Sequence, residues 1–246
     1  MIGWRGMAGL IVPANNGVVL PEIYRALPEG VTAYETRMRA GAHVTSEAVN
    51  KMVTEALGAG EMLAEAGVDM ISYCCMGSSV LMGWDWEDGV LGQLGEVGKC
   101  PVTSANRAML EAFRHLGAKT VALITPYPPV IDDAIPDFFA ARDITVKSIT
   151  KVDVKSYGDE PAHNRDIRYV EPKYLYRLAR EVDLDGVDAL GLLATDMETM
   201  SIIQAIENDL NIPVVSNNQA VVWEIVRTLG LDTAIPGYGR LLDAGQ

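Results

Sequence analysis

Cys75 is the residue of this sequence whose type and position best suit chemistry. It follows an apolar run, residues 68–74, that predicts a buried strand, and it precedes Met76, Gly77 and Ser78. If these three residues open a helix, their backbone N–H groups point at the sulfur. Such N–H groups stabilise a thiolate and also cradle a carboxylate or enolate oxygen. The alternative is a buried structural cysteine, which is common in proteins.

The chain reads as two copies of one unit, and the repeat matches Cys75 with a second position. The tripeptide Gly-Val-Asp at 67–69 recurs at 186–188, and each copy starts a short apolar run. Six residues after the aspartate, the first copy reaches Cys75 and the second reaches Ala194. A repeat of this kind predicts two similar structural units, so two matching strand ends face one cleft and one of them carries a thiol. Further matched segments are 9–13 with 121–126, and 101–108 with 213–220.

Polar side chains follow other predicted strand ends in both halves. Asn15 and Asn16 occupy a turn after the first strand, and Tyr127 occupies the matching turn of the second half. An amide or hydroxyl there can donate to a substrate carboxylate or an enediolate, although turn formation and packing explain the same residues. Thr195 and Asp196 follow the strand that ends near position 194. They predict the N-cap of a helix over 197–209, and the alternative for Asp196 is a proton donor.

Strands that alternate with helices predict an α/β protein of two pseudo-symmetric halves. Each half is expected to be a parallel sheet flanked by helices, with the active cleft between the halves. We expect the first half over residues 1–110 and the second over 111–229, with the tail 230–246 returning to the first half. Residues 84–98 are interpreted as a mobile flap. Expected strands cover 7–13, 31–38, 68–74, 119–124, 144–152, 187–193 and 212–215, and expected helices cover 45–66, 104–116, 131–141, 171–182, 197–209 and 217–229.

The composition argues against several classes of function. A net charge of −13 disfavours nucleic acid and anionic lipid as partners, because both require a basic surface. No apolar run reaches the roughly 18 to 20 residues of a membrane span, so no membrane partner is expected. Metal-ligand, nucleotide-binding and serine-hydrolase motifs are missing from the sequence. Three cysteines, with Cys74 and Cys100 interpreted as core residues, indicate a reducing cytoplasm.

Five segments give the chain a resemblance to a known enzyme superfamily. They are residues 10–16, 73–78, 122–127, 213–220 and 237–242. They resemble the aspartate/glutamate racemase superfamily, and within it the branch of maleate cis–trans isomerases and arylmalonate decarboxylases. The resemblance implies an enzyme that needs no cofactor or metal and acts on a small carboxylate. It also implies a homodimer or a higher homo-oligomer.

The resemblance assigns roles to individual residues. In maleate isomerases the first-half cysteine, which corresponds to Cys75 here, adds to the double bond of the substrate. Asn16 and Tyr127 match substrate-binding residues, and Asn164 matches a further asparagine of the second half. Donors around the reacting carboxylate stabilise the enediolate. The expected substrate-binding set is Asn15, Asn16, Met76, Gly77, Ser78, Asn164, Thr195 and Asn217, with Cys75, Tyr127 and position 194 as the catalytic set.

Ala194 departs from the pattern of the resembling enzymes, which use thiols that face one another across the cleft. Three explanations stay open: a deliberate replacement of cysteine by alanine, proton delivery by Asp196 or water, or a one-thiol reaction such as decarboxylation with Cys75 as the acid. The asparagines at 15, 16 and 164 favour a small hydrophilic diacid. We therefore expect maleate-type isomerisation, with a malonate-type decarboxylase and a non-catalytic carboxylate-binding protein as alternatives.

Overall fold

The protein, described by a computed structural model over residues 1–39, 46–154 and 164–243, contains two four-stranded sheets. The strand order is β2-β1-β3-β4 in the first sheet and β6-β5-β7-β8 in the second, so the two sheets share one topology. Every neighbouring pair of these strands is parallel. The expected α/β class with two parallel sheets is confirmed.

The strands are β1 (Gly6–Pro13), β2 (Val31–Met38), β3 (Met70–Tyr73), β4 (Val102–Ser104), β5 (Thr120–Thr125), β6 (Thr145–Lys151), β7 (Ala189–Leu192) and β8 (Val214–Ser216). The helices are α1 (Val19–Ala26), α2 (Ser46–Glu65), α3 (Met76–Met82), α4 (Trp84–Gly98), α5 (Ala105–His115), α6 (Pro129–Asp132), α7 (Ile135–Ala140), the 3-10 helix η1 (Asn164–Tyr169), α8 (Pro172–Ala179), α9 (Met200–Leu210), α10 (Asn217–Thr228) and α11 (Arg240–Asp243).

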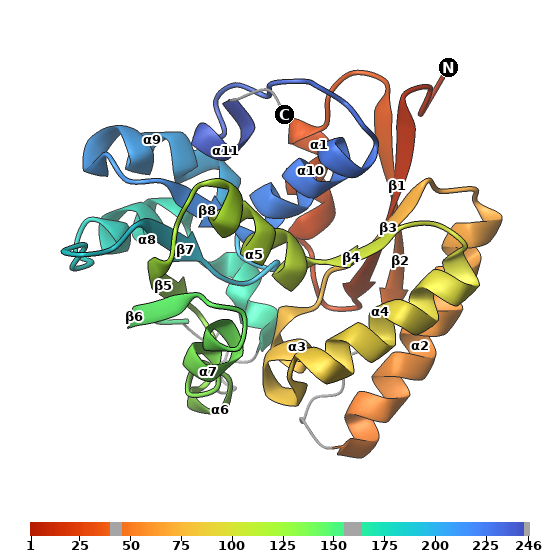
Figure 1. Ribbon diagram of the computed structural model, residues 1–246, viewed down its shortest axis with the longest axis horizontal. Coiled ribbons are helices and arrows are strands. Elements are labelled where there is room, and N and C mark those ends of the chain that lie inside the picture. Colours follow the sequence, from red (N-terminus) through yellow and green to blue (C-terminus); the bar gives the residue numbers. More distant parts are fainter. Residues whose placement is uncertain (40–45, 155–163, 244–246) are drawn as a thin grey trace.

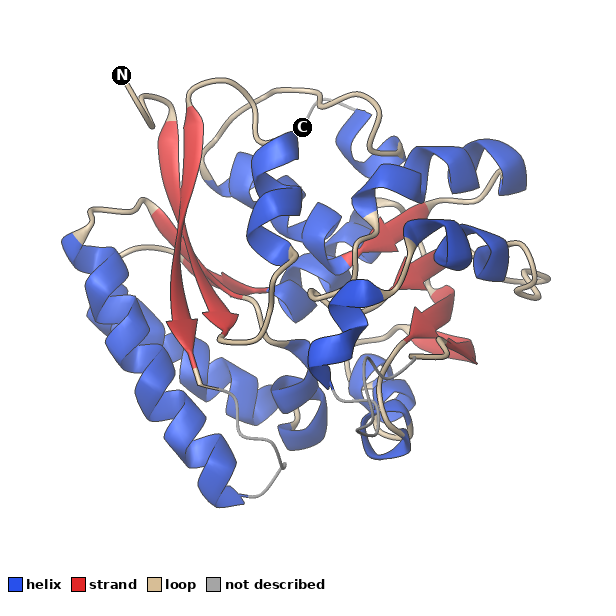
Figure 2. Cartoon of the chain, turned by 180° about the vertical axis from the view of Figure 1, so that it is seen from behind, coloured by secondary structure: helices blue, strands red, loops and turns tan. Residues whose placement is uncertain are grey.

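Helices α1, α5 and α10 lie between the two sheets (Figure 1), where α10 packs against both α1 and α5. Helices α2 and α4 cover the outer side of the first sheet, as the view from behind also shows (Figure 2). Helices α8 and α9 pack together at the outside of the second sheet. One hydrophobic core contains residues of both halves, and a second, smaller core lies beneath α2 and α4. The two halves therefore share the packing that positions their strand ends.

The repeated Gly-Val-Asp tripeptide performs the same structural task in both halves. The Asp69 carboxylate accepts a hydrogen bond from the N–H of Met7 in β1 at 2.8 Å, and the Asp69 N–H donates to the Met7 carbonyl. The Asp188 carboxylate accepts in the same way from two N–H groups at the start of β5, at 2.8 and 2.9 Å. Gly67 and Gly186 have φ of +75° and +62°, a conformation that favours glycine. Each aspartate thus sets the register of the third strand of its half against the first.

The expected flap over residues 84–98 is wrong, because these residues form helix α4. Trp84 and Leu94 are buried against the rest of the first half. Gly89 and Gly92, which suggested a flexible segment, have open space where a side chain would lie. Glycine at such solvent-facing positions costs about 1 kcal/mol of helix propensity each, which the buried side of the helix offsets.

Three further expectations about helices differ from the structure. The helix expected over 131–141 is two short helices, α6 and α7, and Pro136 lies in the first turn of α7, where proline is tolerated. Helices α1 and α11 were not expected. The helix expected from residue 197 begins at Met200, so Thr195 and Asp196 are not its N-cap.

Glu22 in α1 connects the first half to the helices of the second half. One of its carboxylate oxygens accepts from the N–H groups of Thr199 and Met200, both at 2.7 Å, at the start of α9. The other oxygen accepts from the side-chain amide of Asn218 in α10 at 2.7 Å. Glu22 is 2% exposed, and burial raises its pKa against these hydrogen bonds. A first-half carboxylate therefore caps a second-half helix.

The C-terminal segment contacts the first half of the chain. The Tyr238 hydroxyl donates to the Arg25 carbonyl at 3.1 Å, and the Arg5 guanidinium donates to the Thr233 hydroxyl at 2.9 Å. The boundaries expected at residues 110 and 229 stay predictions.

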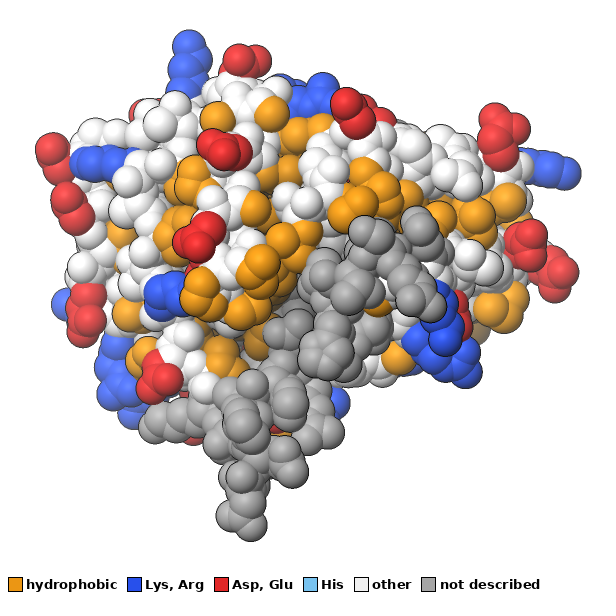
Figure 3. Space-filling model, turned by 90° about the horizontal axis from the view of Figure 1, so that it is seen from below, with side chains coloured by type: hydrophobic (Ala, Val, Ile, Leu, Met, Phe, Trp, Pro, Cys, Tyr) orange, Lys and Arg blue, Asp and Glu red, His pale blue; other side chains and the backbone are white. Residues whose placement is uncertain are grey.

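Charged and hydrophobic side chains occupy different parts of one face of the protein. On the face seen in Figure 3, charged side chains stand mainly around the rim and hydrophobic side chains gather toward the middle. None of the helices within the described ranges has both the length and the hydropathy that a membrane span requires.

Replacing Glu22 by alanine leaves three buried donors without an acceptor. We expect the Glu22→Ala variant to lose about 3 kcal/mol or more of the free energy of unfolding, measured by urea denaturation. The exposed Glu29→Ala is the matched control and should change the free energy by less than about 0.5 kcal/mol. Equal effects of the two variants would contradict a bracing role for Glu22.

Candidate active site

Hydrogen-bond donors surround the sulfur of Cys75 at the carboxyl end of β3. Cys75 is the N-cap residue of α3 and has an extended backbone with φ of −132°. Ser78 donates to the sulfur through its hydroxyl at 3.4 Å and through its backbone N–H. The Tyr73 hydroxyl donates to that of Ser78 at 3.1 Å, since Ser78 gives its own proton to the sulfur. Cys75 is half-buried and also packs against the smaller hydrophobic core, so its sulfur has polar neighbours on one side and apolar ones on the other.

Opposing effects set the pKa of Cys75. Burial raises the pKa of the thiol, whereas Ser78, through its hydroxyl and its N–H, and the nearby Tyr73 hydroxyl lower it. The charge of Glu87 raises the pKa of Cys75 further. The Glu87 carboxylate is fully buried and accepts hydrogen bonds from the side chains of Ser104 and Asn106 at 2.7 and 2.9 Å. The net pKa lies above the ordinary value of a cysteine, so the thiol is mainly neutral at neutral pH. The donors around the sulfur are nevertheless in place to stabilise a thiolate once it forms.

The other two cysteines have different surroundings. Cys74 is fully buried, and burial raises its pKa to about 12, which confirms its interpretation as a core residue. Cys100 precedes β4 and is half-buried rather than part of the core, so that expectation is only partly right. Cys74 and Cys75 both follow the carboxyl end of β3, and of these two Cys75 is the one that is partly exposed.

Ala194 lies two residues after β7, as Cys75 lies two residues after β3. Its φ of +109° is disfavoured for a residue with a side chain. Its N–H donates to the Asn217 side-chain oxygen at 2.9 Å, and the Asn217 amide donates to the Ala105 carbonyl and the Met109 sulfur. Asn217 is fully buried and holds the backbone at position 194. It therefore offers no free amide N–H to a substrate, contrary to its expected binding role.

The hydroxyl of Thr195 joins the two halves beside Cys75. It accepts from the Asn16 amide at 2.9 Å and donates to the Cys74 carbonyl at 3.2 Å. The Asn218 amide donates to the Thr195 carbonyl at 3.1 Å. Thr195 is 5% exposed, and its hydroxyl is engaged on both sides. The structure thus makes this side chain a bridge between the halves.

Asn16 organises the turn after β1. Its side-chain oxygen accepts from two backbone N–H groups at the start of α1, at 3.0 and 3.1 Å. Because one amide N–H binds Thr195, the second is left for a ligand. Asn15 is exposed, and its carbonyl accepts from Arg168 at 3.4 Å. Of the two asparagines, Asn16 belongs to the buried network beside Cys75.

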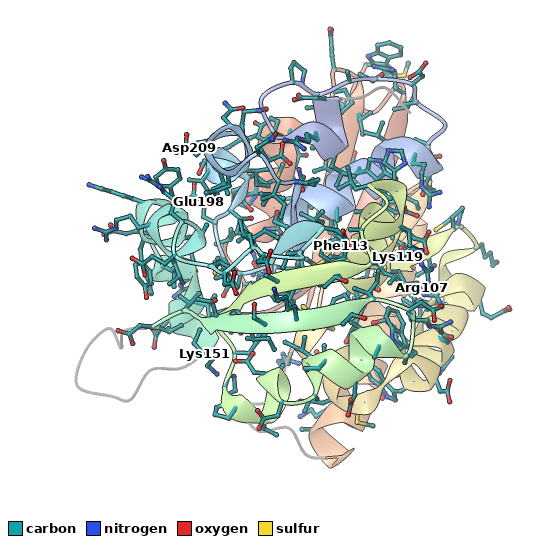
Figure 4. All side chains as sticks on the ribbon, turned by 60° about the vertical axis from the view of Figure 1, so that its left-hand side comes forward. Arg107, Phe113, Lys119, Lys151, Glu198 and Asp209 are labelled. Atoms are coloured by element: carbon teal, nitrogen blue, oxygen red, sulfur yellow. The ribbon has the colours of Figure 1, made fainter. Side chains whose placement is uncertain are left out.

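Tyr127 follows β5 and approaches Cys75 from the second half. Its carbonyl accepts from Lys151 at 2.8 Å, and Lys151 lies at the end of β6 (Figure 4). Burial raises the pKa of Tyr127, and the charges of Cys75 and Asp196 raise it further. The phenol is therefore near both groups. Its hydroxyl has no hydrogen-bond partner within the described ranges and is available to a ligand.

The remaining expected site residues have different surroundings. The Met76 carbonyl accepts from the Asn106 amide at 3.5 Å, and a side chain at Gly77 would lie 3.2 Å from Ile131 of α6. Of the three N–H groups expected at the sulfur, that of Ser78 is the one that donates to it. Asn164 begins η1, and its side chain lies outside the described residues.

Two residues of the sulfur's surroundings were not expected from the sequence. Tyr73 stands two residues before Cys75, and alternate residues of a strand share a face, so the sequence held a signal for it. Glu87 lies in the segment interpreted as a flap, which concealed its burial. Its charge reaches Cys75 only through the packing of α4.

A separate cavity of about 380 Å³ lies where α4, α5 and α10 meet and contains neither Cys75 nor Tyr127. Its charged side chains are largely paired with one another. Arg107 and Arg142 share Asp88, and Arg227 pairs with Glu224 at 2.9 Å. Because two arginines share one aspartate, the lining keeps a small positive excess, but the cavity contains none of the residues expected to carry chemistry.

Comparison with known proteins shows which family this chain belongs to. A family model described as arylmalonate decarboxylase matches residues 8–242. The chain belongs to the arylmalonate decarboxylase family. Among curated proteins, this family member is 28% identical over 248 residues to the maleate isomerase of Geobacillus stearothermophilus, covering 95% of this chain and 96% of that one. It is 26% identical over 238 residues to the arylmalonate decarboxylase of Bordetella bronchiseptica, covering 96% and 95%.

Solved structures of maleate isomerases share the fold of this arylmalonate decarboxylase family member. The maleate isomerase Iso from Pseudomonas putida S16 matches with a TM-score of 0.87 at 27% identity, covering 97% of this chain and 98% of that one. A cysteine-to-serine mutant of the Nocardia farcinica maleate cis–trans isomerase has a covalently bound succinylcysteine intermediate. It matches with a TM-score of 0.84 at 29% identity, covering 97% and 98%. The resemblance noted in the sequence is confirmed.

Removing the Ser78 hydroxyl should make Cys75 less reactive. The Ser78→Ala variant loses one donor to the thiolate, so the pKa of Cys75 rises and alkylation by iodoacetamide at mildly alkaline pH slows by a factor of about 3 to 10. Peptide mass spectrometry separates this rate from that of Cys100. Ser79→Ala is the matched control, because the buried Ser79 hydroxyl has no partner among the described residues. Unchanged alkylation in Ser78→Ala would show that this hydroxyl does not support the thiolate.

Proposed function

We propose that this protein is a cysteine-dependent, cofactor-independent isomerase that converts a small cis-dicarboxylate of the maleate type into its trans isomer. The observation that carries the proposal is the half-buried Cys75, whose sulfur receives a hydrogen bond from Ser78 and lies near Tyr127, a phenol without a hydroxyl partner among the described residues. Relatives named maleate isomerase, and the succinylcysteine intermediate in the structure of one of them, support the proposal.

The reaction forms a carbon–sulfur bond and later breaks it. The Cys75 thiolate attacks one carbon of the double bond, and the π electrons move toward the neighbouring carbon and its carboxylate as an enediolate. The former double bond is now single and rotates. When the electron pair returns, the carbon–sulfur bond breaks, and the trans acid and the thiolate separate. No oxidant or reductant takes part.

Donors that strengthen their bonds to the enediolate lower the barrier. Among the described residues, the Tyr127 hydroxyl and the second amide N–H of Asn16 are two side-chain donors left without a partner beside the strand ends. Loss of one such donor costs a factor of about 10² to 10³ in rate. We infer that these two groups bind the substrate carboxylates, while Thr195 and Asn217 hold the backbone around them.

A malonate-type decarboxylase is the second candidate, because the raised pKa of Cys75 suits a proton donor. Loss of CO₂ from a malonate generates an enediolate directly, and a neutral thiol then protonates it at carbon. The relative named arylmalonate decarboxylase supports this alternative.

The same proposal includes a homo-oligomer, dimeric or higher, and a reducing cytoplasm as the compartment. The three cysteines are free within the structure, as a reducing compartment predicts. Light scattering of the purified protein tests the oligomeric state, and a monomeric mass at all concentrations would refute it.

Incubation with maleate, followed by proton NMR, tests the isomerase proposal. Wild-type protein should form fumarate, and Cys75→Ser should lower the rate by at least about 10³-fold because the attacking thiolate is lost. Cys100→Ser is the matched control and should retain the rate, since Cys100 precedes β4 and lies away from the carboxyl ends of the strands. Tyr127→Phe should lower kcat by about 10²-fold. Equal rates in wild type and Cys75→Ser would contradict the proposal.

Incubation with a methyl- or arylmalonate in D₂O distinguishes the second candidate. A decarboxylase releases a monoacid with one deuterium at the α-carbon, because the Cys75 proton exchanges with solvent before transfer. We expect no such product, or a rate at least about 10²-fold below that with maleate. Fast formation of the deuterated monoacid without conversion of maleate would replace the isomerase by the decarboxylase.

A further inference from the structure

The carboxylate of Asp196 lies at the junction of the two halves with one oxygen bound and the other unbound. Its Oδ1 accepts from the N–H of Gly17, in the turn after β1, at 2.9 Å. Its Oδ2 is buried and has no hydrogen-bond partner among the described residues. Asp196 as a whole is 9% exposed. Because a buried anionic oxygen without a donor is costly, this position favours a group that carries a proton or exchanges one with a ligand.

The groups around Asp196 hold its proton affinity in an intermediate range. Burial raises its pKa to about 7, while the Gly17 N–H and the charges of Arg168 and Arg37 oppose the rise. Tyr127, which follows β5, lies near enough for the charge of Asp196 to raise its pKa. These are the charged and titratable groups that act on Asp196 within the described part of the chain. A carboxyl group of this kind both gives and takes a proton near neutral pH.

Among the described residues at 193–197, which directly follow β7, Asp196 alone has an acidic side chain. Ala194 has no exchangeable side-chain proton. Counting from the matched positions of Cys75 and Ala194, Tyr73 corresponds to Leu192 and Ser78 corresponds to Met197. Leu192 and Met197 are fully buried hydrocarbon and thioether side chains, so the hydroxyl donors of the first half have no counterpart there. Two residues beyond Ala194, the chain instead presents the carboxyl group of Asp196.

We propose that Asp196 is the acid and base of the second half and that it transfers a proton to and from substrate carbon in place of a second thiol. The inference rests on the isomerase reaction proposed for Cys75. The resemblance implies that the related enzymes use two facing thiols. A carboxyl group at Asp196 explains how the same reaction is possible with alanine at position 194.

Each step of the proposed reaction balances. In the reacting form the Cys75 sulfur is a thiolate and Asp196 carries a proton on Oδ2. When the carbon–sulfur bond has formed, the enediolate takes that proton at the neighbouring carbon, which leaves a saturated thioether and an Asp196 carboxylate. After rotation about the carbon–carbon bond, the carboxylate removes a proton from the same carbon, the double bond reforms and the carbon–sulfur bond breaks. The thiolate and the carboxylic acid are restored without a further reactant.

The scheme determines how the rate depends on pH. The pair of Cys75 and Asp196 is active when it holds one proton in total. When both groups are protonated, the sulfur is a neutral thiol and does not attack. When both are deprotonated, no acid remains to protonate the substrate carbon. As pH rises, kcat should therefore first increase as the pair loses its first proton near neutral pH, and then decrease as it loses the second. When Asp196 cannot titrate, only the thiol remains, and the rate should increase with pH through the raised pKa of Cys75 without a later decrease.

The test is kcat and KM for conversion of maleate to fumarate from about pH 5 to about pH 10, a range that covers both groups. Asp196→Asn keeps the shape of the side chain and the acceptor for Gly17. We expect it to lower kcat at the wild-type optimum by about 10² to 10⁴-fold with little change in KM, and to abolish the decrease at high pH. Asp196→Glu should recover part of kcat and the bell shape. Glu198→Gln is the matched control, because Glu198 is a partly exposed acid near Asp196 in the sequence that pairs instead with Arg25 of α1 at 3.4 Å.

The possible results separate this inference from the proposed function. A bell-shaped profile that persists in Asp196→Asn, with kcat within about twofold of wild type, overturns the role of Asp196 and leaves the Cys75 isomerase standing. A profile altered equally by Glu198→Gln also overturns it, because the effect is then a general one of surface charge. If wild-type protein forms no fumarate at any pH, the proposed function fails and this inference fails with it. Circular dichroism of each variant verifies the fold.

Discussion

The geometry of the cleft depends on the hydrogen bonds of the Thr195 hydroxyl. They run from Asn16 of the first half, through Thr195 of the second half, to the carbonyl of Cys74 in the first half. Because these groups are buried, each bond is stronger than it is in water, and breaking one leaves unpaired polar atoms. The residue after Cys74 carries the reactive sulfur. The contact therefore sets the distance between that sulfur and the second-half segment at 194–196.

The two halves keep one architecture and differ in chemistry. The strand order, the aspartates at the start of β3 and β7, and the turns after β1 and β5 are shared. The first half supplies a thiol whose donors oppose the effect of burial. The second half supplies a strained backbone at Ala194, the Tyr127 phenol and a carboxyl group. A duplicated fold thus brings an acid–base group and a nucleophile to one cleft from opposite sides.

Local sequence patterns predicted most of the elements and the position of Cys75, because strand length, helix periodicity and glycine stops are local properties. The repeat predicted the common topology, since matched segments fold alike. The sequence could not assign the tasks of Asn217 and Thr195, because their hydrogen-bond partners come from distant segments. It also misassigned α4, where glycines on the exposed side obscured a buried apolar face. The capping of α9 by Glu22 is likewise a tertiary contact that no local pattern announces.

The claim on which this account rests is that the Cys75 sulfur bonds to substrate carbon. Protein mixed with maleate, quenched in acid during turnover and digested, should yield a peptide heavier by the mass of one maleic acid. Fragmentation should place that mass on Cys75 rather than on Cys74, and the modified peptide should be missing from Cys75→Ser. Steady formation of fumarate while Cys75 stays unmodified, or an adduct confined to Cys100, would contradict the account.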